Sequence, residues 1–117
     1  MNHNITVHLT ARLFAEEKCY GPGVQRLLTA VEQLHSLRSA AASMNMAYSK
    51  AWSIIRSAEQ GFGCKLLVST IGGSGGGGAT LTDEARQIMA AYDEYCRKLD
   101  EYSGALFREL FGFCTEE

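Results

Sequence analysis

The sequence predicts a mainly helical domain with a small β-component, and three patterns support this fold class. Two helical segments lie close together in the middle of the chain, joined by Asn45 and Met46. Two short strand-like stretches flank a run of small residues at 72–78. A helical apolar stripe then fills most of residues 83–111, longer than a compact domain of 117 residues needs. Together these patterns predict a winged helix-turn-helix with an N-terminal strand and a long C-terminal dimerisation helix.

The N-terminal third contains a predicted strand and a predicted helix. Residues 5–13 alternate apolar and polar side chains, which is typical of a half-buried strand. A polar turn is expected over residues 16–20. Pro22 has the fixed φ that suits the first turn of a helix. Apolar residues then recur at spacings of three and four, which predicts an amphipathic helix running to about Leu34.

Residues 36–60 form the predicted helix-turn-helix. A short alanine-rich helix is expected over 39–44, where small side chains let another helix approach closely. Asn45 tolerates the left-handed conformation that ends many helices, and Met46 can fill the core beneath the turn. The second helix of the pair is expected over 48–60.

This second helix has an inward apolar face and a polar outer face. Trp52 lies beside apolar neighbours, so we interpret it as a core anchor, although its ring could also stack on a base. Tyr48 begins the helix, so its ring can pack inward while its hydroxyl reaches a phosphate. Gly61 and Gly63 are expected to end the helix.

A hairpin and a long helix complete the expected fold. Strands are predicted over 65–71 and 79–81, with the glycine run between them as the tip of a wing. Thr82 is a good N-cap for the final helix. Gly104 could break or kink that helix and leave a separate docking segment behind it. We expect a DNA-binding domain over residues 1–81, with the helix-turn-helix at about 36–60 and the wing at about 65–81, and a dimerisation helix over 82–117.

Composition and charge limit the function classes. The apolar fraction of 46% and the charged fraction of 21% are those of a globular protein. No apolar run approaches the ~18 residues of a membrane span, and no signal peptide is evident, so we expect a cytoplasmic protein with no membrane partner. The net charge is −2. Residues 36–80 nevertheless carry four bases against Glu59 alone, whereas residues 81–117 carry four bases against nine acids. This asymmetry permits one DNA-facing surface.

No enzyme chemistry, metal or cofactor is predicted. The four cysteines form no CxxC pair, and we expect reduced, structural or incidental thiols. The three histidines lack metal-ligand spacing. A literal G-x-G-x-x-G at Gly73, Gly75 and Gly78 is not followed directly by a helix, so it does not predict a dinucleotide site. The carboxylates of the last helix are expected on its solvated side.

The candidate contacts are of two kinds. We expect double-stranded DNA to meet the start of the predicted helix pair, the polar face of its second helix and the wing tip, at Arg38, Ser39, Tyr48, Ser49, Lys50, Ser53, Arg56, Gly73, Ser74 and Gly75. We expect the overlong stripe to bury itself against a second copy of the chain, through Ile88, Tyr92, Tyr95, Leu99, Tyr102 and Leu106.

Three stretches resemble the N-terminal DNA-binding domain of the ModE family of molybdate-responsive regulators. They are GPGVQRLL (21–28), SLRSAAASMNMAYSKAW (36–52) and GGSGGGGATLT (72–82). The middle stretch is also similar, more loosely, to the helix-turn-helix of LysR-type regulators. The resemblance implies a winged helix-turn-helix homodimer that binds a palindromic operator. It carries over recognition-helix positions to Tyr48, Ser49 and Lys50 and wing positions to Gly72–Gly78.

Two departures from the ModE pattern qualify these expectations. The family continues into oxyanion-binding domains, whereas this sequence stops at Glu117, so we do not expect molybdate to bind this chain. Ser74 stands where a base would help phosphate binding, which predicts modest affinity and a shallow salt dependence. Two other functions stay open: a winged-helix module that binds a protein partner instead of DNA, and a small-ligand or metal sensor that uses the cysteines.

Overall fold

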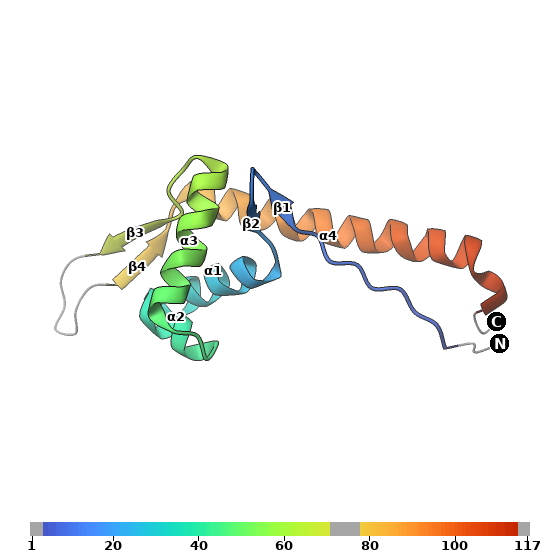
Figure 1. Ribbon diagram of the computed structural model, residues 1–117, viewed down its shortest axis with the longest axis horizontal. Coiled ribbons are helices and arrows are strands. Elements are labelled where there is room, and N and C mark those ends of the chain that lie inside the picture. Colours follow the sequence, from blue (N-terminus) through green and yellow to red (C-terminus); the bar gives the residue numbers. More distant parts are fainter. Residues whose placement is uncertain (1–3, 71–77, 115–117) are drawn as a thin grey trace.

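The computed structural model describes residues 4–70 and 78–114. Figure 1 shows a helical body at one end, from which a single long helix extends, and the molecule measures 61 × 27 × 21 Å. In chain order the elements are β1 (Leu13–Phe14), β2 (Lys18–Tyr20), α1 (Pro22–Leu34), α2 (Leu37–Ser43), α3 (Tyr48–Phe62), β3 (Leu67–Thr70), β4 (Gly78–Leu81), α4 (Asp83–Leu110) and a final 3₁₀ turn, η1 (Gly112–Cys114). The mainly helical class with small hairpins is as predicted.

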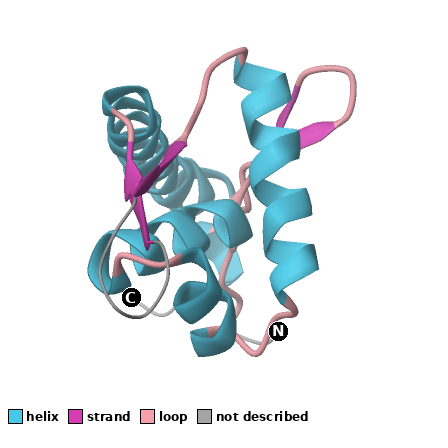
Figure 2. Ribbon diagram, turned by 90° about the vertical axis from the view of Figure 1, so that its left-hand side faces the viewer, coloured by secondary structure: helices cyan, strands magenta, loops and turns pink. Residues whose placement is uncertain are grey.

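The core of the body lies between α1, α2 and α3. Leu27, Leu28, Ile55 and Leu66 are fully buried, and burial of each such side chain contributes roughly 1.5–3 kcal/mol. The helices approach closely because the facing positions are small: Ala40, Ala41, Ala51 and Ala58 are buried. In Figure 2 the three helices of the body pack around this core.

The turn between α2 and α3 has the predicted chemistry. Asn45 adopts a left-handed conformation with φ 53°, and the Met46 amide donates to the Ala41 carbonyl at 2.9 Å. Met46 packs partly buried against the core. The start of α2 was predicted too late, because the hydroxyl of Ser36 accepts from the Ser39 amide at 3.0 Å and begins the helix at Leu37.

The end of α3 corrects one expectation. Gly63 ends the helix in the left-handed region, with φ 72°. Gly61, expected to stop the helix, lies inside it. Its role is steric, because a Cβ at this position would lie 2.5 Å from the Cβ of Cys19 in β2. Gly61 therefore allows β2 to pack directly on α3.

The hairpin of β3 and β4 forms the wing. The strands are antiparallel, with Leu67 opposite Leu81 and Thr70 opposite Gly78. Strand β3 begins at Leu67, two residues later than predicted. The Ala79 amide donates to the His35 carbonyl at 3.0 Å. This bond fixes the wing to the junction of α1 and α2. The predicted wing-tip contacts Gly73, Ser74 and Gly75 lie outside the described residues.

The predicted N-terminal strand over 5–13 is wrong for most of its length. Only Leu13 and Phe14 are in a strand, paired with β2, and residues 5–12 belong to none. This segment instead runs beside α4 (Figure 1), where Val7 and Leu9 lie near Gly104. Alternating apolar and polar side chains give a segment one apolar face, but a strand also needs a neighbouring strand to pair with. Within the described residues, no strand pairs with 5–12. The polar turn expected over 16–20 is correct only in part, since β2 begins at Lys18.

The last helix runs through Gly104 without a break. Thr82 caps α4 as predicted: its hydroxyl accepts from the Ala85 amide at 3.0 Å. Along the outer side, Arg97 forms ion pairs with Glu94 and Glu101, both at 3.0 Å. Among the described residues, no helix is both long and apolar enough to cross a membrane.

Candidate nucleic-acid interface

The outward face of α3 is polar, exposed and free of acidic side chains. Its exposed residues are Ser49, Lys50, Ser53, Arg56, Ser57 and Gln60. The one acid of the helix, Glu59, is turned away, because its carboxylate accepts from the Leu66 amide at 2.9 Å and holds the root of the wing. The predicted contacts on this helix therefore lie together on one surface, which presents donors and two positive charges to solvent.

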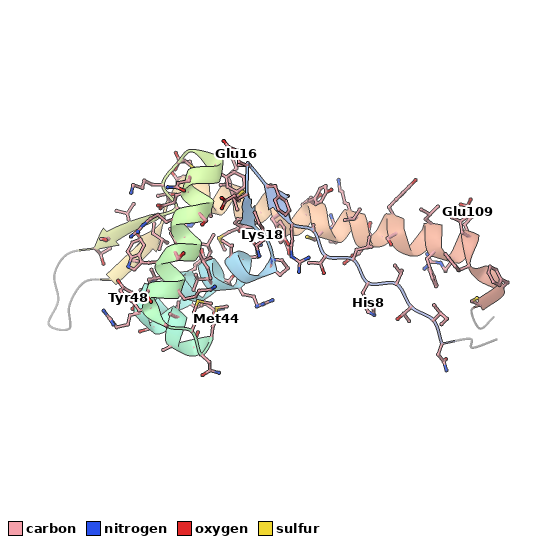
Figure 3. All side chains as sticks on the ribbon, viewed as in Figure 1. His8, Glu16, Lys18, Met44, Tyr48 and Glu109 are labelled. Atoms are coloured by element: carbon pink, nitrogen blue, oxygen red, sulfur yellow. The ribbon has the colours of Figure 1, made fainter. Side chains whose placement is uncertain are left out.

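Aromatic rings support one edge of this face. The Arg38 guanidinium of α2 lies 4.1 Å from the centre of the Tyr48 ring, and Tyr48 meets Trp52 edge-on with their centres 6.4 Å apart. The Arg56 guanidinium lies 5.8 Å from the centre of the Trp52 ring. Cation–π contacts of this kind hold long side chains in place. Figure 3 shows Tyr48 where α3 begins.

Trp52 departs from its prediction as a core anchor. Its ring packs against the core but is only partly buried. It lines a groove between α2, α3 and the wing, together with Tyr48, Arg38 and Ser39. The sequence could not show this, because Trp52 lies at the lateral edge of the apolar stripe of α3 and the burial of that edge depends on where the wing docks.

Buried polar contacts fix α4 to the body. The Tyr20 hydroxyl donates to the Gln25 side chain, whose amide donates in turn to the Met89 carbonyl at 2.9 Å. The Tyr92 hydroxyl donates to the Ala11 carbonyl at 2.7 Å. Burial, followed by a hydrogen-bonding interaction with the Cys96 side chain that favours the protonated phenol, raises the pKa of Tyr92 to about 12. Burial also raises the pKa of Tyr20. Both tyrosines therefore stay neutral donors near pH 7, and the direction of α4 is set by the body.

The predicted dimer stripe divides into two parts. Ile88 and Tyr92 pack onto the body of their own chain, and Tyr92 is 7% exposed. Leu99 is half-buried, whereas Tyr95, Tyr102 and Leu106 are open, with Tyr102 69% exposed. The exposed apolar surface continues beyond Leu106, at Leu110, Phe111 and Phe113. These residues lie in the stretch after Gly104 that the sequence indicated as a docking segment, but they were not among the predicted dimer contacts.

Cysteines and metal ligands form no comparable site. Among the described residues, no two cysteines form a disulfide, and Cys19 is buried. Across residues 4–70 and 78–114, no three side chains of histidine, cysteine, aspartate or glutamate gather to hold a metal ion.

Three helices pack around a buried core, the outward face of α3 is free of acids, and a hairpin docks beside it. These features define the helix-turn-helix class of transcription regulators. The chain belongs to the family of bacterial regulatory helix-turn-helix proteins of the lysR type, whose profile matches residues 25–86. This match runs from α1 to the first turn of α4. The family is one of DNA-binding regulators and not of enzymes.

Three curated relatives are similar to most of the chain. "Molybdenum transport protein ModE" of Azotobacter vinelandii is 39% identical over 84 residues, covering 71% of this chain and 30% of that protein. The protein of the same name from Herbaspirillum seropedicae is 34% identical over 76 residues, covering 65% and 28%. "Transcriptional regulator ModE" of Haemophilus influenzae is 30% identical over 89 residues, covering 76% and 33%. The chain thus spans about a third of the length of these relatives.

Proposed function

We propose that the chain binds a palindromic DNA operator as a homodimer, with α3 in the major groove. The exposed, acid-free face of α3 carries this proposal. Ser49, Lys50 and Ser53 would meet base edges near the start of the helix, and Arg56 would meet a phosphate. Arg38 and Ser39, across the groove from α3, would meet the backbone at the edge of the same site.

The wing and α2 support this assignment. Ser36 caps α2, and the His35 carbonyl beside it holds Ala79 of the wing. The start of α2, α3 and the wing line one groove, and recognition surfaces bind more tightly when their parts are preorganised. A solvated helix face with no such neighbours would give weaker support for DNA binding.

Fluorescence anisotropy with a duplex selected by the wild-type chain from a random pool tests the DNA-reading face. We expect Lys50→Ala combined with Arg56→Ala to bind at least tenfold more weakly, because charged contacts to bases and phosphates are worth about 1–3 kcal/mol each. Lys98→Ala with Arg108→Ala removes the same charge from α4 and serves as the control. Equal affinity of both double variants would refute the placement of α3.

We further propose that α4 supplies the dimer interface through its exposed stripe. Tyr95, Leu99, Tyr102 and Leu106 recur at spacings of four and three, the pattern of a coiled-coil seam. Tyr95 and Tyr102 are 55% and 69% exposed in the single chain, and a second copy related by a two-fold axis would cover them. Tyr92 is left out of this contact set, because its side chain is buried in its own chain.

Light scattering tests the dimer. Tyr95→Glu with Tyr102→Glu is expected to give monomers, since it places like charges in an apolar seam. Ala90→Glu with Arg108→Glu adds acids on the side of α4 that helical periodicity places opposite, and should stay dimeric. A dimer that survives the tyrosine change would contradict the interface.

A protein-binding module is the second candidate, because the apolar surface extends past the proposed seam to Phe111 and Phe113, which are 45% and 61% exposed. Absence of wild-type binding to any duplex at low salt would favour this role over DNA recognition. No molybdate binding is proposed for the described residues.

A further inference from the structure

A pocket beside the outer face of α3 collects basic side chains from distant parts of the sequence. Its lining comes from the segment before β1, from β2, from the start of α1 and from α3. Four of its residues are bases and none is an acid: Arg12, Lys18, Arg26 and Lys50. We call this feature the basic pocket. Figure 3 labels Lys18, which lies on β2 next to α3.

The charges in the basic pocket are not neutralised by neighbours. The ion pairs of the described residues all involve Arg86, Arg97 or Lys98, and none involves a base of the pocket. Like charges held in one concave site raise the local positive potential and attract anions. The pocket therefore favours a negatively charged occupant.

The sequence conceals this concentration of charge, because the acids of residues 1–35 balance the bases. Folding places the acids outside the pocket. Glu32 is directed to Arg86 of α4, 3.6 Å away. Glu16 and Glu17 line an adjacent depression at the turn of β1 and β2, which shares Lys18 with the basic pocket.

The backbone at the pocket adds donors to the bases. Gly21 is the N-cap of α1 and no side chain caps the helix there. A Cβ built on Gly23, in the first turn, would meet no atom within 4 Å, so the space beside this residue is open. Amides at a helix start bind anions, and arginine and lysine are the usual side-chain partners of phosphate. Ser53 and Ser57 supply hydroxyls from α3.

We propose that the basic pocket binds a tetrahedral oxyanion group of the phosphate class. Its position indicates the occupant: Ser53 and Ser57 line both the pocket and the outward face of α3. Arg38 lies on the opposite flank of α3, by the wing. A helix in a major groove has one phosphate backbone on each side, so the pocket can hold a phosphate of the DNA strand opposite the one near Arg38. This DNA source rests on the proposed function; free inorganic phosphate is the other source of the same chemistry.

Titration with inorganic phosphate, followed by amide NMR shifts, tests the site without DNA. We expect saturable shifts confined to the start of α1 and the facing part of α3. Lys18→Gln with Arg26→Gln should abolish them, whereas Arg108→Gln on α4 should leave them unchanged. Gly23→Glu is a second variant, which places an acid in the pocket at a helix start where acids are tolerated, and should also abolish the shifts.

Salt-dependent DNA affinity separates the two sources. With a DNA phosphate in the pocket, Lys18→Gln with Arg26→Gln should weaken binding about three- to tenfold and lower the slope of log affinity against log salt by about 0.9 per lost phosphate contact. Arg108→Gln should change neither. If the wild type shows phosphate-induced shifts but Lys18→Gln with Arg26→Gln leaves DNA binding unaltered, the pocket binds a free oxyanion and not a DNA phosphate. Absence of those shifts, together with DNA affinity and salt slope equal to the control, would overturn the proposal.

Discussion

Raising the pH above 10 should weaken the attachment of α4 to the body, because that attachment depends on two buried neutral tyrosines. Tyr92 is 7% exposed, donates to the Ala11 carbonyl at 2.7 Å and meets Tyr20 edge-on with ring centres 5.1 Å apart. A phenolate could not donate this hydrogen bond. It would also be a charge in a poorly solvated site.

The magnitude follows from the pKa of Tyr92, which burial, with the Cys96 hydrogen bond, raises from 10.0 to about 12. The unfolded chain releases the proton above pH 10, whereas the folded chain retains it up to about pH 12. Stability is therefore full below pH 10 and falls as the pH rises through this window. At about 1.4 kcal/mol per unit, Tyr92 alone should remove about 3 kcal/mol of the free energy of unfolding. Tyr20, whose pKa is also raised by burial, acts in the same direction.

Urea unfolding followed by circular dichroism between pH 8 and pH 12 measures the effect. At pH 8 the free energy of unfolding of Tyr92→Phe should be about 1 kcal/mol lower than that of the wild type, because the hydrogen bond to Ala11 is missing. As the pH rises, the free energy of unfolding should fall less in this variant than in the wild type. Tyr48→Phe, whose ring lies between Arg38 and Trp52 on the outward side of α3, should keep the wild-type profile and serves as the control. An alkaline loss in Tyr92→Phe equal to that of the wild type would refute the reasoning.

Two further substitutions probe the packing and the recognition surface. Gly61→Ala should lower the free energy of unfolding by about 1–3 kcal/mol in urea titrations, because its Cβ would lie 2.5 Å from the Cβ of Cys19. Gly112→Ala, whose Cβ would meet no atom within 4 Å, should leave the free energy of unfolding unchanged. Equal stability of the two variants would contradict the tight contact. Tyr48→Ala should weaken DNA binding in anisotropy about two- to fivefold by removing the ring beside Arg38. Tyr48→Phe keeps the ring and loses only the hydroxyl expected near a phosphate, so it should weaken binding less. Affinity that falls equally in both variants would assign the effect to the hydroxyl.

The helices of the body could be predicted from the sequence because their signals are local. The apolar spacing of three and four placed α1 through to Leu34, as observed. Asn45 marked the turn before α3 because its side chain tolerates a left-handed backbone, and Thr82 marked the start of α4 because its hydroxyl caps the first amides.

Features that depend on contacts distant in sequence could not be predicted in the same way. The alternation at 5–13 indicated a strand, but a strand also requires a neighbour, and the segment lies beside α4 instead. Tyr92 belongs to the same stripe as Tyr102, yet only Tyr92 reaches the body, because α4 passes beyond it. Gly61 resembled a helix stop, and only its contact with Cys19 explains a glycine inside the helix.

The candidate DNA surface was predicted where it depends on one helix and missed where it depends on several. The polar face of α3 followed from helical periodicity, whereas the convergence of Arg12, Lys18 and Arg26 on Lys50 depends on the packing of β2 and α1 against α3. Counting charges along the chain gave a neutral N-terminal third and concealed this arrangement.

Hydroxyl-radical footprinting of the wild-type chain on a duplex selected from a random pool tests the central claim most directly. If two copies of α3 occupy successive major grooves, the two binding patches lie about 34 Å apart. The footprint should then show two protected patches on each strand, one helical turn of about 10 base pairs apart, related by the two-fold symmetry of the site. A single protected patch, or no protection at low salt, would contradict a dimer that reads DNA through α3.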